Sequence, residues 1–223
     1  MLFDALGTLV ELDPPAPSLR RGLARRGGLG ITAAEAEHAI AAEIAYYRAH
    51  LDEGRDQASL ARLRRRCAAV LRAALPRCAR GLELHLIEEI LLDALRFEAF
   101  DDARPALRAA RQTGSRVVVV SNWDISLEGV LEQLGLASLL DGVITSASAG
   151  ARKPSPKIFS QALELAAVPP ERALHIGDSL EEDVEGARSV GIAAVLVRRD
   201  GSPGPPGVRT ISTLAQLRFA RPS

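Results

Sequence analysis

Residues 173–197 read ALHIGDSLEEDVEGARSVGIAAVLV and contain an apolar run, an amphipathic segment and a second apolar run in succession. The runs 173–176 and 193–197 are short and largely apolar, which is typical of strands buried on both faces. Between them, residues 182–190 predict a helix that Gly191 stops. A strand, a crossover helix and a second strand indicate a parallel sheet with helices on its faces.

The same alternation extends back along the chain to Asp101. Its most apolar strand consists of four consecutive valines, and Gly or Pro residues follow the helices. The predicted fold is therefore α/β, with a doubly wound, Rossmann-like core built on a parallel sheet. Its further elements are strands at 117–120 and 142–145, helices at 105–113, 125–134 and 155–167, a Gly/Pro loop at 201–207 and a short helix at 213–219.

A different pattern occupies residues 18 to about 100, where apolar residues recur at helical spacing without a strand signal. Thr32 and Glu35 form a capping box that predicts the start of one helix. Apolar stripes at 60–75 and 84–95 predict two others, within a bundle of about four helices. The predicted domains are a core of residues 1–12 and 101–223 and an inserted, all-helical cap of residues 13–100.

Composition narrows the classes of function. The formal net charge of the 223 residues is zero, which argues against the basic surface of a nucleic-acid-binding protein. No apolar run approaches the roughly 18 residues that span a membrane, and the N-terminus has no signal-peptide pattern. The two cysteines, Cys67 and Cys78, lie in one helical stretch and supply no disulfide framework. We therefore expect a cytoplasmic protein without membrane or nucleic-acid partners.

Polar residues follow the predicted strands of the core. Only three residues precede the first of them, Asp4, which is short for a strand. The carboxyl ends of parallel strands open into one crevice, so we expect these side chains to meet there. They are Asp4 after the first strand, Ser121 and Asn122 after the valines, Lys153 beyond the third strand, and Asp178 after the fourth.

These residue types fit a phosphoryl-transfer site. A carboxylate such as Asp4 can attack an electrophile and form a covalent intermediate. Ser121 and Asn122 precede a helix and can bind phosphate oxygens there. The chain has only two lysines, Lys153 and Lys157. Lys153 can neutralise a transferring group. Asp4 and Asp178 supply the one or two carboxylates that Mg²⁺ typically takes.

Each residue also has a structural explanation when it is taken alone. Asp4 can cap a loop, Ser121 can cap the following helix, and Lys153 can be an exposed surface residue. Acidic residues at 181–183 suit the N-terminus of a helix, which does not account for Asp178 at a strand end. Because all of them follow strands in one crevice, the functional interpretation is favoured.

The motifs DALGTL at residues 4–9, Ser121-Asn122, Lys153-Pro154 and GDS at 177–179 with Asp183 resemble the four motifs of the haloacid dehalogenase superfamily. The helical cap between the first two resembles that of subfamily I. The resemblance implies Asp4 as nucleophile, Ser121 binding the transferred group and Lys153 steadying the intermediate. It also implies the strand order 5-4-1-2-3. The implied Mg²⁺ ligands are Asp4, the Leu6 carbonyl and Asp178, with Asp183 binding directly or through a neighbour.

Leu6 departs from the family pattern, because family phosphatases carry a second Asp two residues after the nucleophile. A leucine can neither protonate the leaving oxygen nor activate water, help that is typically worth about 10²–10⁴-fold. We expect a Mg²⁺-dependent phosphatase that is slow, prefers a good leaving group or uses an acid from the cap. The candidate cap residues, each of which also suits a surface or packing role, are His38, Glu43, Tyr47 and His50.

Two alternatives stay open. Dehalogenases of this superfamily share the Asp-Ala-bulky-Gly-Thr pattern, release halide without an acid and need no metal, so the Asp178 and Asp183 pair argues against this reading. The second alternative is a catalytically weak member that binds a phosphorylated ligand or a protein through its cap. The expected partner is a small, phosphorylated molecule, and the chain is a monomer or homodimer. Arginines at 20–26 and 62–66 suit solvated helix faces better than a substrate site.

Overall fold

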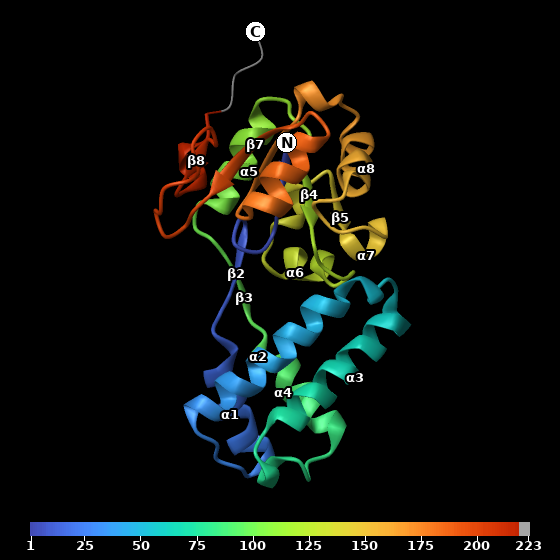
Figure 1. Ribbon diagram of the computed structural model, residues 1–223, viewed down its shortest axis with the longest axis vertical. Helices are drawn as coiled ribbons and strands as arrows, with labels where there is room; N and C mark the ends of the chain where they lie inside the picture. Colours follow the sequence, from blue (N-terminus) through green and yellow to red (C-terminus); the bar gives the residue numbers. More distant parts are fainter. Residues whose placement is uncertain (219–223) are drawn as a thin grey trace. The chain divides into compact units, whose positions relative to one another are not determined.

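The computed structural model describes residues 1–218 of the chain, which form two compact units (Figure 1). One unit contains Met1–Glu11 and the described chain from Glu98 onward, and it holds the main sheet. The other unit, Leu12–Phe97, holds the helices α1 to α4. The helical unit is therefore inserted into the sheet unit near its N-terminus.

The main sheet is parallel, and its order is β5-β4-β1-β6-β7-β8. Read from β7 to β5, and with the core strands numbered along the chain, the first five have the order 5-4-1-2-3, which confirms the predicted fold class. The short central strand lies between the valine strand and the strand that precedes the acidic motif. The bounds are β1 Leu2–Phe3, β4 Val118–Ser121, β5 Gly142–Thr145, β6 Leu174–Gly177 and β7 Ala193–Val197.

The sixth strand, β8 (Thr210–Ile211), was not expected from the sequence. The Gly- and Pro-rich residues before it predict a loop, and the strand forms only because β7 lies beside it: the amide of Leu196 donates to the carbonyl of Arg209 at 2.9 Å. The short helix predicted at 213–219 is a 3₁₀ turn, Leu214–Gln216. Residue 219, the last of the predicted helix, lies outside the described part of the chain.

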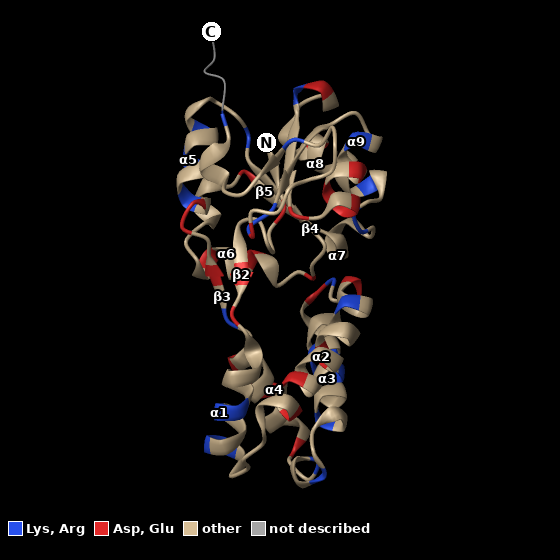
Figure 2. Cartoon of the chain, turned by 60° about the vertical axis from the view of Figure 1, so that its left-hand side comes forward, with Lys and Arg blue, Asp and Glu red and all other residues tan. Residues whose placement is uncertain are grey.

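Helices cover both faces of this sheet, with α5 on one side and α8 and α9 on the other (Figure 2). The face under α8 buries apolar side chains from the strands and the helices together, among them Leu2, Val118, Ile158 and Phe159. Continuous apolar strands are needed because neither face is solvated. The helices are α5 Ala103–Gln112, α6 Leu127–Gln133, α7 Ser146–Ala149, α8 Pro156–Ala166 and α9 Gly186–Ser189.

The inserted unit contains the four helices that its periodicity predicts: α1 Pro15–Gly27, α2 Ala33–His50, α3 Gln57–Ala74 and α4 Leu84–Ala94. The capping box is confirmed, because the Thr32 hydroxyl accepts from the amide of Glu35 while the Glu35 carboxylate accepts from the amide of Thr32. Leu19, Leu63, Leu71 and Ile87 are among the side chains of its separate apolar core.

A two-stranded ribbon corrects the expectation that no strand occurs between residues 18 and 100. Strand β3 (Phe97–Ala99) pairs with β2 (Val10–Leu12). The pair is antiparallel, because the amide of Asp13 donates to Arg96 at 2.9 Å and that of Phe100 to Leu9 at 3.1 Å. Three residues are too few for a periodic signal, and the pairing partner is remote in sequence.

Arginines of the inserted unit gather on α1 and α3 (Figure 2). Most of them are exposed, and Arg26 and Arg66 form ion pairs with nearby acidic residues of the same unit. These contacts fit solvated helix faces. Among residues 1–218, no helix has the length and apolar character that crossing a membrane requires.

Glu43 on α2 lies in the interior of the inserted unit and hydrogen-bonds Cys67 on α3. Burial raises the pKa of its carboxyl group. Of the other cap candidates, His38 is exposed, and the His50 ring stacks on Tyr46 with Nδ1 2.7 Å from the Tyr46 carbonyl oxygen. Glu43 therefore has a packing position, and ionisation of its buried carboxyl group lowers the stability of the fold as pH rises.

We expect Glu43→Gln to weaken the dependence of stability on pH. A raised folded-state pKa gives stability that is fully present below the unfolded value of about 4.3 and is lost as pH rises through the folded value. The loss at pH 8 relative to pH 5 should shrink by an amount within the ordinary range for one substitution, about 0.5–3 kcal/mol. Urea unfolding at both pH values measures it. Glu37→Gln, an exposed change on the same helix, is the control, and equal pH dependence in both variants would contradict the prediction.

Candidate active site

Asp4 lies directly after β1, and its amide donates to the carbonyl of Ile176 at 2.8 Å. The loop behind it is tight, with the amide of Val10 donating to Ala5 at 2.9 Å. Gly7 has φ +79°, and a Cβ there would lie 2.3 Å from Oδ2 of Asp178. The loop thus needs glycine both for its backbone conformation and for the close approach of that carboxylate.

The carboxylate of Asp4 is buried and accepts two side-chain hydrogen bonds on the same oxygen. The Ser121 hydroxyl donates to Oδ1 at 3.0 Å, and the Lys153 ammonium donates to it at 2.7 Å. Three of the predicted site residues, from three different strand ends, therefore meet in one place. Two donors on one oxygen orient the carboxylate.

Lys153 is held at both its backbone and its side chain. Asn122 accepts from the Lys153 amide at 2.8 Å and donates to its carbonyl oxygen at 3.1 Å. The ammonium, 2% exposed, also donates to Oδ1 of Asp183 at 2.5 Å. The amide of Asn122, predicted to bind substrate, is thus engaged with the lysine backbone, and it also hydrogen-bonds Glu182.

Asp178 and Asp183 flank the start of a turn that the sequence predicts as an α-helix from residue 182. The structure has a π-helical turn, Leu180–Glu185, followed by α9. Oδ2 of Asp183 accepts from the Ser179 amide at 2.9 Å, which holds the carboxylate back against the strand end. A Cβ at Gly177 would lie 2.1 Å from the Asp183 carboxyl carbon, so glycine makes this approach possible. Such wide turns often occur at functional sites.

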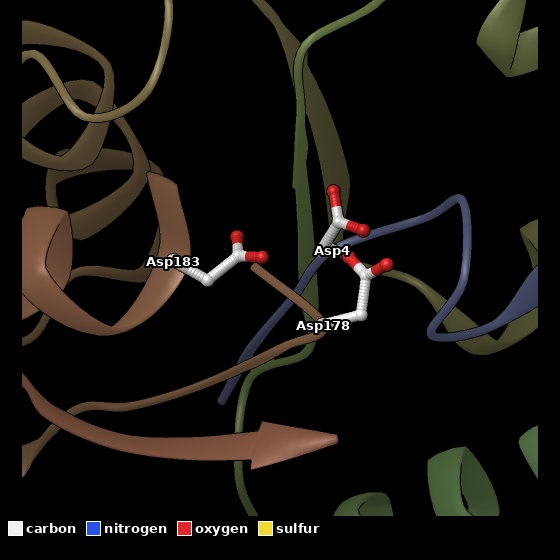
Figure 3. Close-up of side chains that lie close together, drawn as sticks. All are labelled: Asp4, Asp178 and Asp183. Atoms are coloured by element: carbon white, nitrogen blue, oxygen red, sulfur yellow. The ribbon is translucent and has the colours of Figure 1, made fainter. Parts of the chain in front are cut away.

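Three carboxylates converge here: Asp4, Asp178 and Asp183 each offer an oxygen within 4.8 Å of the others (Figure 3). Burial and the charges of Asp4 and Asp183 raise the pKa of Asp178 to about 7. Burial also raises the pKa of Asp4, against the opposing charge of Lys153. The single ammonium of Lys153 does not balance three carboxylates, and a divalent cation with oxygen ligands fits the cluster.

Lys153 and Asp183 form the charged pair of the site. Burial alone would lower the pKa of Lys153, but Asp4 and Asp183 raise it above its usual value. Burial alone would likewise raise the pKa of Asp183, but Lys153 and His175 hold it well below its usual range. The pair is therefore ionised at neutral pH.

Leu6 lies partly exposed in the loop after Asp4 and forms a bridge with Val10.

Two residues near the site were missed by sequence reasoning. His175, on β6, is fully buried with Nε2 2.8 Å from Oδ1 of Asp183. The Ser146 hydroxyl, also fully buried, accepts from the amide of Trp123 at 3.2 Å and so anchors the loop after Ser121. A histidine within an apolar strand run was an available signal, because a buried imidazole needs a partner. Ser146 gave none.

Comparison with known proteins places the chain in a family. A family model described as haloacid dehalogenase-like hydrolase matches residues 1–191. Haloacid dehalogenase-like hydrolase domain-containing protein 3 of Bos taurus is 46% identical over 101 residues, which cover 45% of this chain and 40% of that protein. Phosphatase MT3486 of Mycobacterium tuberculosis is 35% identical over 133 residues, 58% of this chain and 61% of that protein. The matches thus span less than two thirds of the length of either relative.

Solved structures resemble nearly the whole chain. A phosphatase of this superfamily from Thermococcus onnurineus is 28% identical with a TM-score of 0.66, over 96% of this chain and 94% of that one. The defluorinating L-2-haloacid dehalogenase Rha0230 has a TM-score of 0.72 at 20% identity, over 96% and 90%, a likeness in fold alone. The family model covers most of the sequence and both units contain the expected elements, so the chain belongs to the haloacid dehalogenase-like hydrolases.

Proposed function

We propose that the chain is a Mg²⁺-dependent phosphatase of small phosphorylated molecules, with Asp4 as nucleophile and residues 13–100 as its cap. The observation that carries the proposal is the buried Asp4 carboxylate, which accepts from both Ser121 and Lys153 beside two further carboxylates. Relatives named as phosphatases support this choice of substrate class.

The reaction has two displacements at phosphorus. A carboxylate oxygen of Asp4 forms a bond to phosphorus while the bond to the leaving oxygen breaks, which gives an aspartyl-phosphate. The leaving oxygen departs with the electron pair of that bond and takes its proton from solvent. Water then attacks that phosphorus, releases inorganic phosphate and restores the carboxylate, its protons passing to solvent. Ser121 and Lys153 both donate to Asp4, and this contact supports the proposal that they hold the oxygens of the transferred group.

Asp4 and Asp178, with the Leu6 carbonyl, would hold the Mg²⁺ ion. When bound, the ion would neutralise charge on the phosphoryl oxygens and on the two carboxylates. Asp183 accepts from Lys153, His175 and the Ser179 amide, so we assign it to holding Lys153 beside the ion. This division leaves Asp178 as the carboxylate whose charge most needs the cation.

One observation favours a second candidate. Leu6 stands where the acid that protonates a leaving oxygen would stand, and a halide leaving group needs no such proton. The chain would then be a 2-haloacid dehalogenase, and Asp4 would displace halide from carbon. The crowding of Asp178 and Asp183 beside Asp4 supports the metal-dependent phosphatase instead. A member that binds phosphorylated ligands without turnover is the remaining outcome.

Metal binding should appear in stability. The folded-state pKa of Asp178 is raised to about 7. The stability that its protonated carboxyl group contributes is therefore fully present below the pKa of an unfolded Asp and is lost as pH rises through about 7. We expect millimolar Mg²⁺ to restore it at pH 8, by about 2.7 kcal/mol when the free ion is about 100-fold above its Kd. Thermal melts at pH 5 and 8 with Mg²⁺ or a chelator measure this. Asp178→Asn should remove both effects, whereas Glu181→Gln, an exposed change in the same acidic turn, should keep them.

Turnover of p-nitrophenyl phosphate tests the reaction directly. We expect Mg²⁺-dependent phosphate release that falls to background in Asp4→Asn, because no nucleophile remains. Ser121→Ala should lose about 10²–10³-fold, the usual cost of removing one donor to developing charge. Acid-quenched wild type should carry phosphate on Asp4 by mass spectrometry. Halide release from a 2-haloacid without phosphatase activity would establish the second candidate, and binding of phosphate esters without turnover the third.

Leu6→Asp separates a missing acid from an adapted site. If only the acid is missing, turnover of an alkyl phosphate should rise by about tenfold or more. The upper limit is the 10²–10⁴-fold that acid–base help typically gives. An aryl phosphate, whose leaving group departs without a proton, should gain less. Leu6→Asn, which has the same shape without the proton, is the control and should gain nothing. Lower rates of Leu6→Asp on both substrates would mean that Leu6 belongs to a specialised site.

A further inference from the structure

His175 lies in the middle of the main sheet with none of its surface exposed. It is the second residue of β6 and pairs with Leu2 on one side and Ala194 on the other. Its ring meets that of Phe159 edge to face, with 5.2 Å between the ring centres. A polar side chain in such an apolar layer costs stability unless it makes a hydrogen bond.

The one polar contact of this ring defines its tautomer. Nε2 lies 2.8 Å from Oδ1 of Asp183, and an ionised carboxylate can only accept, so the hydrogen is on Nε2. Within residues 1–218, Nδ1 is buried and has no hydrogen-bond partner. The imidazole therefore presents a single N–H donor, and that donor points at the site.

Asp183 receives donors on both oxygens. Oδ1 accepts from Lys153 at 2.5 Å and from His175 at 2.8 Å, while Oδ2 accepts from the Ser179 amide at 2.9 Å. Of these donors, the lysine is at the end of a flexible chain, whereas His175 and the amide are attached to rigid backbone. The imidazole thus decides where Oδ1 lies, and Oδ1 in turn decides where the ammonium lies.

We propose that His175 is a positioning residue, whose Nε2–H holds Asp183 so that the Lys153 ammonium is shared between Asp183 and Asp4. Without this N–H the Asp183 carboxylate can rotate, and Lys153 loses its second anchor. The ammonium then pairs more tightly with Asp4 and weakens it as a nucleophile. The kinetic part of this inference rests on the proposed phosphatase activity; the structural part does not.

Matched variants of the whole chain test the kinetic part. His175→Leu removes the donor at nearly constant volume. In His175→Gln, the side-chain amide retains an N–H that can reach Asp183. We expect kcat to fall about 10–100-fold in His175→Leu, the usual effect of losing a supporting hydrogen bond. KM should change little, and His175→Gln should recover most of the rate. Phe159→Leu, which alters packing on the same ring without touching a charged group, should lower stability and keep kcat.

The lysine itself supplies a measurement that needs no activity. The chain has only Lys153 and Lys157, and the second is exposed, so the ¹⁵N resonance of the buried ammonium can be assigned by one substitution, Lys157→Arg. We expect the Lys153 signal to shift or broaden in His175→Leu and to stay near its wild-type position in His175→Gln and Phe159→Leu. With only four histidines, the Nε2–H tautomer of His175 can be read from the imidazole spectrum.

The outcomes separate this inference from the proposed function. Absence of phosphatase turnover in wild type would refute the phosphatase alone, since the Lys153 signal still reports whether His175 controls the ammonium. An unchanged Lys153 signal in His175→Leu would overturn the positioning role. Equal loss of rate in the Leu and Gln variants, in step with lower thermal stability, would also overturn it. If His175→Leu does not fold, His175→Asn replaces it, because its shorter amide keeps polarity but cannot reach Asp183.

Discussion

A buried ammonium organises the whole site. Lys153 donates to Asp4 at 2.7 Å and to Asp183 at 2.5 Å, so one charge joins the end of β1, the loop beyond β5 and the turn after β6. Two carboxylates buried side by side would otherwise protonate or move apart, because desolvation and mutual repulsion both oppose their charged forms. A compact ammonium with several donors can satisfy both, whereas a planar guanidinium needs a wider gap.

The sheet order makes this arrangement possible. The short central strand β1 lies between β4 and β6, so the residue after it is flanked by Ser121 on one side and Asp178 on the other. Ligands in open α/β sheets bind beyond the carboxyl ends of the strands, where the order reverses. Glycine completes the fit at Gly7 and Gly177, where any Cβ would collide with the carboxyl groups of Asp178 and Asp183.

The sequence predicted the layers of the fold better than the details of the site. Apolar runs and helical stripes identify the core strands and α1 to α4, because burial alone produces those patterns. The ribbon of β2 and β3 depends on pairing between residues more than eighty positions apart, which no local pattern carries. The π-helical turn and the contact of Asn122 with Lys153 depend on hydrogen bonds between separate loops. His175 was visible as a polar residue in an apolar strand, but its partner follows eight residues later, in the next turn.

Leu6 is best understood through the charge of this cluster. Three carboxylates already crowd one ammonium, and burial together with the charges of Asp4 and Asp183 raises the pKa of Asp178 to about 7. A fourth carboxylate in the same loop, next to a glycine that abuts Asp178, would add repulsion that only a bound cation could offset. A leucine keeps the backbone carbonyl, removes that repulsion and gives up proton transfer. In the proposed reaction, Asp4, Lys153 and Asp178 would therefore supply the charges of the site, and the residue at position 6 would decide which leaving groups that site can release.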